Sequence, residues 1–373
     1  MKIVRGYKTE LDLNNTQRTA CLKHAGAARY AYNWGLKRYQ EEYAALRKTP
    51  NAISLHKELN SLKKTDFPWM YEVSKCAPQE ALRDLEKAFK NFFKKCKLKK
   101  AGAWKQKCGY PRFKSKKKGI GSFRLTGSIH VFEKQIQLPR LGLLKLKEAG
   151  YLPTSGVNIL SATVSEKAGR WYISVQVEEE VADPVPTTGK AIGVDLGVKT
   201  LATTSEAVAY ENPKALRKNL KKLARLGRKH SRKKKGSKNR QQAARRLARM
   251  HARIANIRQN AIHQATSAIA KTKPCMIVLE DLNVRGMMAN KRMARAVGDV
   301  GMHEFKRQIT YKAEREGVSI LTVSRWFPSS KTCSCCGWVD KDQELDDRVF
   351  VCLDCGYVAD RDYNAAKNLA ASA

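Results

Sequence analysis

The spacing of apolar positions predicts helices near the N-terminus of the chain and strands after them. From Thr16 to Leu46, alanines and other apolar residues recur at intervals of three and four, and Gly and Pro are sparse, which predicts one long helix. From Pro78 to Lys97, an apolar stripe follows an N-terminal proline, and acidic residues occupy the first turns. This second segment is therefore predicted to be a helix that packs against others.

Five aromatic residues crowd the first predicted helix, beside Arg29, Lys37 and Arg38. Aromatic residues at helical spacing are more often core residues than a surface on which nucleobases stack. We therefore expect most of them to pack inward, with base stacking as the alternative for any single ring. The five residues are Tyr30, Tyr32, Trp34, Tyr39 and Tyr43.

After Gly109 the helical spacing gives way to short alternating runs. Ser122–Leu146 and Val157–Glu178 alternate apolar and polar residues between Gly and Pro turns, which predicts strands of a small β-barrel or sandwich. Asp183–Gly189 contains two prolines and predicts a linker at a domain boundary. Beyond it, Lys190–Thr204 reads as two short apolar strands joined by a turn.

The charge of the chain is strongly positive and unevenly distributed. Its 73 Lys and Arg residues against 34 Asp and Glu residues give a formal net charge of +39, which indicates a polyanionic partner such as nucleic acid. Two stretches, Lys87–Val131 and Asn212–Leu279, hold no acidic residue. A solvated face explains two such stretches poorly, so we interpret them as surfaces that contact phosphates, although charge alone does not separate DNA from RNA. The candidate contacts are Arg112, Lys114, Lys116, Lys117, Lys118, Lys221, Lys222, Arg225, Arg228, Arg232, Lys233 and Lys234.

Composition excludes several other classes of protein. A hydrophobic content of 42% is too high for a disordered basic tail. No apolar run approaches the roughly 20 residues that span a bilayer, and Met1–Glu10 lacks the apolar core of a secretory signal. We therefore expect an intracellular protein without a membrane segment, in which the 10 cysteines do not form a disulfide framework.

Three carboxylates occupy positions that favour a shared site. Asp195 lies inside an apolar strand, where a carboxylate is costly unless it is paired, hydrogen-bonded or bound to a metal. Glu280 ends the predicted strand Cys275–Glu280, and active sites of open sheets tend to form at the ends of central strands. Asp362 lies at the start of a predicted short helix, where a negative charge is favoured.

If these three carboxylates converge they need divalent metal, because like charges at close range raise one another's pKa. Two Mg²⁺ ions about 4 Å apart would bridge shared carboxylates, activate a water and stabilise the leaving oxygen of a phosphodiester. Mg²⁺ suits such a site because it prefers hard oxygen ligands. The neighbouring Asp281 and Asp360, taken singly, are better explained as caps or salt-bridge partners of the many lysines. The sequence thus predicts a magnesium-dependent phosphodiesterase site.

Four cysteines near the C-terminus have the spacing of a structural zinc site. Cys333 and Cys336 form one Cys-x-x-Cys pair, Cys352 and Cys355 form another, and 15 residues separate the pairs. Glycine follows each pair, so each forms a knuckle that points two sulfurs at one ion, and four thiolates complete the tetrahedral shell of Zn²⁺ with no open position. Cys335 falls outside this spacing and is interpreted as a bystander, with ligand exchange against Cys336 left open.

The order of several motifs resembles the TnpB family, transposon-encoded RNA-guided DNA endonucleases related to type V CRISPR effectors. The motifs are Gly193-Val-Asp195-Leu-Gly197, Val278-Leu-Glu280-Asp-Leu-Asn283, Ser329-Ser-Lys-Thr-Cys333 with the cysteine pairs, and Asp360-Arg-Asp362-Tyr-Asn-Ala-Ala366. The N-terminal Tyr32-Asn-Trp-Gly-Leu36 fits as well. Each motif alone is weak, but their combination is specific and spans nearly the whole chain.

The resemblance implies a multidomain α/β fold with four parts. It implies an RNase H-like (RuvC) nuclease domain formed by residues 186–326 and 360–373, with a zinc ribbon at residues 327–359 inserted in it. It also implies an N-terminal β-barrel wedge domain, residues 1–15 and 108–185, interrupted by a helical recognition lobe at residues 16–107.

The resemblance further implies that Asp195, Glu280 and Asp362 are the catalytic acids of a metal-dependent DNA endonuclease. Such a protein binds a noncoding guide RNA from the transposon end, reads a short motif in double-stranded DNA and cuts where the guide pairs, because base pairing supplies the sequence specificity. Transposon association implies a bacterial or archaeal cytoplasm. The alternatives are a guide-independent transposase with the same three acids, and a catalytically silent RNA-guided DNA binder, which would have lost an acid.

Overall fold

The structure, a computed structural model, describes residues 1–47, 49–344 and 347–373. They divide into two compact units, Met1–Ala182 and Asp183–Ala373, each with its own hydrophobic core. Residue 48 of the expected recognition lobe and residues 345 and 346 of the expected zinc ribbon lie outside the described residues. The side chain of Lys118 is also outside them. None of the helices in the described ranges combines the length and the apolar character that a membrane crossing needs.

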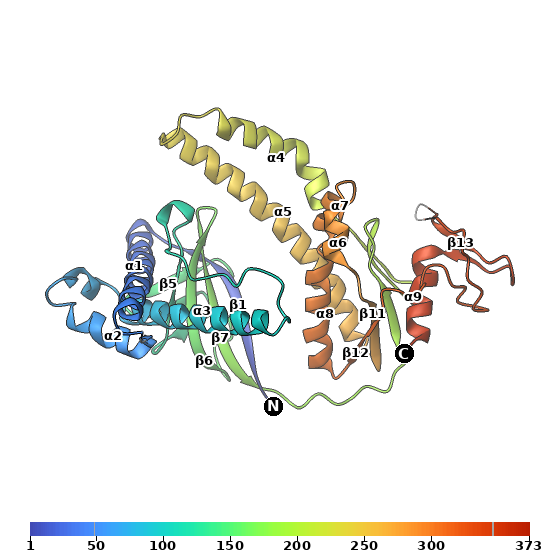
Figure 1. The fold of residues 1–373 in the computed structure, drawn as a ribbon, viewed down its shortest axis with the longest axis horizontal. Helices are drawn as coiled ribbons and strands as arrows, with labels where there is room; N and C mark the ends of the chain where they lie inside the picture. Colours follow the sequence, from blue (N-terminus) through green and yellow to red (C-terminus); the bar gives the residue numbers. More distant parts are fainter. Residues whose placement is uncertain (48, 345–346) are drawn as a thin grey trace. The chain divides into compact units, whose positions relative to one another are not determined.

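The described part of the first unit joins an antiparallel seven-stranded sheet to helices that lie between its first and second strands in sequence (Figure 1). The strand order is β2-β6-β7-β1-β5-β4-β3, so the N-terminal strand lies inside the sheet. The strands are β1 (Lys2–Asp12), β2 (Ser122–Leu125), β3 (His130–Val131), β4 (Gln135–Leu138), β5 (Gly142–Leu146), β6 (Asn158–Lys167) and β7 (Arg170–Glu180). The helices are α1 (Asn15–Leu46), α2 (Ala52–Ser61) and α3 (Cys76–Lys100), with 3-10 turns η1 (Pro68–Glu72) and η2 (Lys116–Lys118).

Local sequence explains where α1 begins and how it packs. A reciprocal capping box forms at its start, where the Asn14 side chain accepts from the Gln17 backbone and the Gln17 side chain accepts from the Asn14 backbone. At Gly35 a Cβ would lie only 2.5 Å from Leu82 Cδ2, so glycine lets α1 approach α3 closely. The two helices predicted from apolar spacing are confirmed, and so are the alternating strands.

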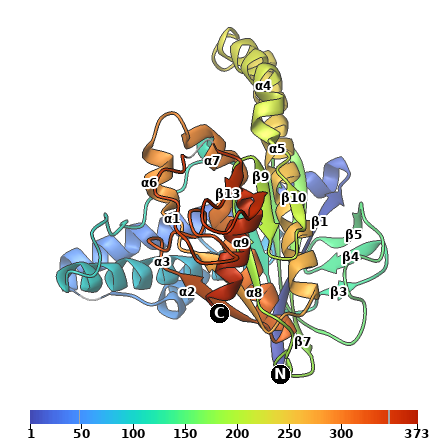
Figure 2. The ribbon, with the colours of Figure 1, turned by 90° about the vertical axis from the view of Figure 1, so that its right-hand side faces the viewer.

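The second unit is built on a five-stranded sheet with the order β10-β9-β8-β11-β12, in which β8, β11 and β12 run parallel. Helices α5 and α8 cover one face of this sheet and α9 covers the other (Figures 1 and 2). The strands are β8 (Ile192–Asp195), β9 (Thr200–Thr204), β10 (Ala209–Glu211), β11 (Met276–Glu280) and β12 (Ser319–Val323), and a separate hairpin contains β13 (Val349–Val351) and β14 (Val358–Asp360). The helices are α4 (Ala215–Ser231), α5 (Lys238–Lys271), α6 (Val284–Ala289), α7 (Ala294–Val300), α8 (Met302–Glu316) and α9 (Arg361–Ala371).

Helices α4 and α5 form a long hairpin that extends away from the sheet of the second unit (Figures 1 and 2). Buried Met250 and Ile254 of α5 meet Leu223 and Leu226 of α4 along an apolar seam. The buried carboxylate of Asp299 fixes the base of the hairpin. It accepts from the first backbone N–H groups of α4 at 2.9 and 3.2 Å, and the Arg258 guanidinium of α5 donates to it at 3.1 Å. One carboxylate thus replaces the missing side-chain cap of α4 and neutralises a cation of α5.

Candidate active site and metal centre

Asp195 and Glu280 end two neighbouring parallel strands. Strands β8 and β11 pair in parallel, with Val194 opposite Leu279, and each acid is the next and last residue of its strand. Both acids therefore lie at the carboxyl edge of the sheet, which was predicted for Glu280, whereas Asp195 was predicted inside its strand and is instead its last residue. Helix α9 contacts β8, β9 and β11 and begins beside this edge.

A close helix–strand contact brings the third acid to the same place. At Gly193 of β8, a Cβ would lie 2.0 Å from the Ala366 carbonyl oxygen and 2.9 Å from Leu369 Cβ, so α9 packs directly on the strand backbone. In the turn after β8, a Cβ at Gly197 would lie 3.8 Å from Asp362 Oδ2. The glycines of the Gly193–Gly197 motif therefore make room for the helix that carries Asp362.

The electrostatics of the three acids show that they share one environment. Burial, and then the charges of Asp362 and Glu280, raise the pKa of Asp195 to about 7, against a smaller opposing effect of Arg361. Burial, and then Asp281, raises the pKa of Glu280. Burial, and then Asp360, raises the pKa of Asp362, while Arg361, Arg348 and Lys199 oppose the rise. A cluster of this kind holds more negative charge than its protein surroundings neutralise, which is a property of cation sites.

The two acids next to this cluster have structural partners. Asp281 accepts from the Arg325 guanidinium, with Nε at 3.1 Å, and this hydrogen bond lowers the pKa of Asp281. Asp360 caps α9, because its Oδ1 accepts from the backbone N–H groups of Asp362 at 2.9 Å and Tyr363 at 3.1 Å. The interpretation of these two residues as a salt-bridge partner and a cap is confirmed.

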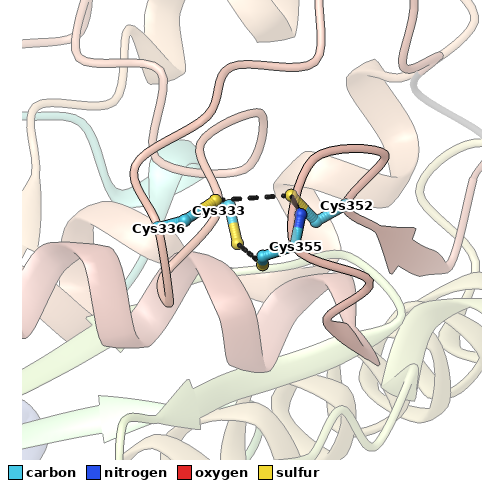
Figure 3. Close-up of side chains that lie close together, drawn as sticks. All are labelled: Cys333, Cys336, Cys352 and Cys355. Carbon is cyan, nitrogen blue, oxygen red and sulfur yellow. Dashed lines mark hydrogen bonds between the residues drawn. The ribbon is translucent and has the colours of Figure 1, made fainter.

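The four cysteines predicted as metal ligands come together in the hairpin region (Figure 3). Their sulfurs all lie within 4.8 Å of one another, with Cys333 and Cys355 3.7 Å apart and Cys336 and Cys352 3.5 Å apart. A tetrahedral ion with bonds of about 2.3 Å to sulfur requires sulfurs about 3.8 Å apart, so the donor set fits Zn²⁺ in both chemistry and size. Cys335 is exposed and stands outside this group.

Two matching turns present these sulfurs. In the first, the Gly337 N–H donates to the Cys333 carbonyl at 3.0 Å, and in the second the Gly356 N–H donates to the Cys352 carbonyl at 3.1 Å. Both glycines have a positive φ, 82° and 71°, which explains why glycine follows each pair. Fully buried Phe350 packs between the knuckles with Trp338 and Tyr357.

Two buried asparagines of α9 fasten the first knuckle to the helix that carries Asp362. Asn364 is fully buried, and it accepts from the Ser334 backbone at 3.0 Å and donates to the Thr332 carbonyl at 2.7 Å, on both sides of Cys333. Asn368 donates to the Thr332 carbonyl at 2.6 Å and to the Ser329 carbonyl at 2.8 Å. The sequence interpretation missed these residues, although two asparagines four apart on the apolar side of a helix are an unusual pattern.

The basic loop at residues 112–118 of the first unit is held by hydrogen bonds from α1. Asn33 donates to the Lys114 carbonyl at 2.9 Å and accepts from the Lys114 backbone at 2.7 Å, and Arg29 donates to the Ile120 carbonyl at 3.1 Å. Arg112, Lys116 and Lys117 are exposed on this loop. Lys114 is exposed as a residue too, but its ammonium lies 3.9 Å from the ring centre of Tyr32 and desolvation lowers its pKa, so of the described candidates in this loop it is the least suited to phosphate.

The remaining candidate contacts are all exposed on α4 and the turn that follows it: Lys221, Lys222, Arg225, Arg228, Arg232, Lys233 and Lys234. Three of the five aromatic residues of α1, Tyr32, Trp34 and Tyr39, pack against the core as expected, whereas Tyr30 and Tyr43 are exposed. Tyr32 and Tyr39 are buried, whereas Tyr30 and Trp34 line an open cleft of about 640 Å³ with Arg29, Lys37 and Trp69.

Three family models match the chain in sequence order. A helix-turn-helix domain model matches residues 1–48, a model described as "Probable transposase" matches residues 172–291, and a model described as "Cas12f1-like, TNB domain" matches residues 303–369. The second and third matches include all three clustered acids and all four clustered cysteines.

The chain is also similar to proteins and structures along its full length. It is 34% identical to a Streptomyces pristinaespiralis protein named "Putative RNA-guided DNA endonuclease", covering 100% of this chain and 90% of the relative. It is 34% identical to "Putative RNA-guided DNA endonuclease InsQ" of Escherichia coli K12, covering 100% and 93%. Its fold resembles that in "Cryo-EM structure of the Cas12f1-sgRNA-target DNA complex", with a TM-score of 0.56 at 15% identity over 99% of both chains. The chain belongs to the TnpB family, as the order of its motifs indicated.

Proposed function

We propose that the protein is an RNA-guided, magnesium-dependent DNA endonuclease of a transposon. The observation that carries this proposal is the common environment of Asp195, Glu280 and Asp362 at one edge of a sheet. Nearly full-length relatives with 34% identity are named as RNA-guided DNA endonucleases, which supports the same activity here. The relatives are bacterial, and we place the protein in the bacterial cytoplasm.

In this proposal, the second unit contains the nuclease domain. Residues 186–326 and 360–373 form an RNase H-like (RuvC) domain, and residues 327–359 form the inserted zinc ribbon. The parallel strands β8, β11 and β12, flanked by antiparallel β9 and β10, support the RNase H-like assignment. In the first unit, residues 1–15 and 108–185 form the wedge domain and residues 16–107 form the recognition lobe, which agrees with a sheet whose strand β1 precedes the helices and whose other strands follow them.

The three acids would hold Mg²⁺, because they are hard oxygen donors that lack enough protein cations to balance their charge. Their oxygens are more widely spread than the sulfurs of the cysteine group, since no three acids among the described residues offer one oxygen each within 4.8 Å of one another. We propose that these acids would hold two ions rather than one, as phosphodiester hydrolysis by paired metals requires. Bound Mg²⁺ would supply the activated water and the charge stabilisation that phosphodiester hydrolysis needs.

The four cysteines would hold Zn²⁺ as a structural ion. Four thiolates leave no open coordination position, so this ion has no direct part in hydrolysis. Its role is to fold the two knuckles, and through Asn364 and Asn368 to support the start of α9.

Exposed cations on the loop at 112–118 and on α4 would bind the phosphates of guide RNA and target DNA. These surfaces carry many charges and few groups that read bases, as expected where guide pairing supplies the specificity.

The proposal is tested by purifying the protein from cells that carry its native locus and sequencing the RNA bound to it. We expect one defined transcript from the transposon end, and cleavage of DNA that matches its guide next to a short motif. Ribonuclease treatment before addition of DNA should abolish cleavage. Absence of any specific transcript, or cleavage that survives ribonuclease, would favour the guide-independent transposase instead.

A further inference from the structure

Trp326 is almost fully exposed, which is costly because a large apolar ring is then in contact with water. Its side chain is 86% exposed, whereas the next most exposed of the six tryptophans, Trp69, is 39% exposed. A tryptophan side chain buries 150–250 Å² when it packs, so a ring left this open in the folded chain is available to a partner.

The backbone of Trp326 lies a few residues beyond the end of the strand that pairs with Glu280. In the parallel pair of β11 and β12, Val323 is opposite Glu280, and Trp326 follows Val323 by three residues. Neighbouring strands are about 4.8 Å apart and three residues extend at most about 11 Å. The backbone of Trp326 is therefore within about 16 Å of Glu280, which is a reach of only a few nucleotides along a single strand.

The turn that carries the ring is fixed on both sides. Before it, the Arg325 guanidinium binds Asp281, the neighbour of Glu280, and the Trp326 N–H donates to Ser324 Oγ at 3.4 Å. After it, the Ser329 carbonyl accepts from Asn368 of α9, the helix that carries Asp362. The segment that carries the exposed ring is thus tied to two of the three elements that hold the acids, the end of β11 and helix α9, which is how a rigid binding surface is built.

The surroundings of the ring favour an anionic partner with flat, apolar faces. Arg325 precedes the ring, and its exposed guanidinium uses only two of its five N–H donors on Asp281, which leaves others for a phosphate. A single-stranded nucleic acid combines phosphates for such cations with bases that stack on aromatic rings. A protein partner would require a wider apolar surface than one ring and its charged neighbour supply.

We propose that Trp326 is a stacking platform for one base of the DNA strand that enters the active site, so that it holds the strand close to the bond that is cut. This assignment rests on the proposed nuclease function and adds a residue that positions its substrate. Because any base has a flat face, the contact tolerates all sequences, as a guided nuclease requires.

The test combines variants with substrates that lack single bases. We compare the cleavage of single-stranded targets by RNA complexes of the wild-type protein, Trp326→Ala and Trp326→Phe. The control is Ile53→Ala, which removes another exposed apolar side chain, in α2. We expect Trp326→Ala to raise KM at least about 5-fold with little change in kcat, and Trp326→Phe and Ile53→Ala to stay within about 2-fold. Equal zinc content and melting temperature of all variants show that the fold is intact.

An abasic site moved one nucleotide at a time should weaken cleavage by wild-type protein at one position, and that same abasic site should have no further effect on Trp326→Ala. If the abasic site and Trp326→Ala each reduce cleavage by the same factor whether or not the other is present, the stacking assignment is wrong. Equal KM values for wild type and Trp326→Ala would also overturn it. If wild type cuts no DNA, the nuclease proposal fails by itself. Quenching of a 2-aminopurine base in bound single-stranded DNA then still tests stacking: loss of quenching in Trp326→Ala supports it, and unchanged quenching contradicts it.

Discussion

Asn364 of α9 binds the backbone on both sides of Cys333, through Ser334 N–H at 3.0 Å and the Thr332 carbonyl at 2.7 Å. Two residues earlier, the same helix carries Asp362. A fully buried side chain therefore connects the proposed structural metal with one of the proposed catalytic acids. The four-cysteine group and the helix that carries Asp362 are parts of one hydrogen-bonded arrangement.

This connection predicts that Asn364→Ala weakens zinc binding and cleavage together. The change leaves the half-buried Ser334 N–H without its acceptor, at a cost of about 1–3 kcal/mol. Zinc release to a competing chelator should be faster, and cleavage should fall by at least about 5-fold. The matched control is Asn15→Ala, since Asn15 is exposed at the start of α1. Normal zinc retention with reduced cleavage would show that Asn364 does not connect the two sites.

Gly193→Ala is predicted to disrupt the active site from outside it. The added Cβ would lie 2.0 Å from the Ala366 carbonyl and 2.5 Å from the Ala370 backbone nitrogen, so α9 must move away from β8. We expect a loss of about 3 kcal/mol or more in the free energy of unfolding, measured with denaturant. In Gly6→Ala, by contrast, the new Cβ meets nothing within 4 Å, and stability should change little. Similar stability of the two variants would contradict the close packing of α9 on β8.

The zinc content of cysteine variants should show which cysteines bind the ion. The purified protein is expected to hold one zinc ion per chain, which Cys352→Ser removes because three thiolates no longer complete the tetrahedron. Cys335→Ser should retain the ion, because Cys335 is exposed and outside the group. Elemental analysis of the two variants decides between a fixed ligand set and exchange of Cys335 into it. Loss of zinc from Cys335→Ser would support exchange.

The basic face of α4 should contribute to RNA affinity through phosphates alone. Replacing Arg225, Arg228 and Arg232 by Ala removes up to three phosphate contacts, and each lost contact should reduce the slope of log K against log salt concentration by about 0.7–0.9. Binding is measured by filter retention between low and physiological salt. The control replaces Lys2, Lys167 and Lys341, exposed cations outside the acid-free stretches. An equal effect of both triple variants would mean that net charge matters and the face of α4 does not.

Much of the site could be predicted from sequence because its signals are local. Asp195 stood out as a charge in an apolar strand, and the cysteine spacing fixes a knuckle within a few residues. Strand ends and helix starts follow from the same local patterns, so the positions of Glu280 and Asp362 on their elements were predictable.

What could not be predicted depends on contacts between distant residues. Asp299 joins α4, α5 and α7 only because the chain folds back over some 80 residues, and nothing near it in sequence marks it as a cap. The α4–α5 hairpin appeared in the sequence as an acid-free charge run, since its charges obscure the seam that pairs the helices. The exposure of Trp326 is likewise a property of the folded chain alone.

The central claim is that three acids from two strands and a helix form one metal-dependent catalytic site. Its most direct test is single-turnover cleavage of guide-matched DNA by Asp195→Asn, Glu280→Gln and Asp362→Asn, each purified with its RNA and assayed with Mg²⁺. We predict that each change reduces cleavage at least about 1,000-fold while RNA and DNA affinities stay within about 3-fold of wild type, because each removes a charge that a metal ion needs. Cleavage near the wild-type rate by any one of the three variants would contradict the claim.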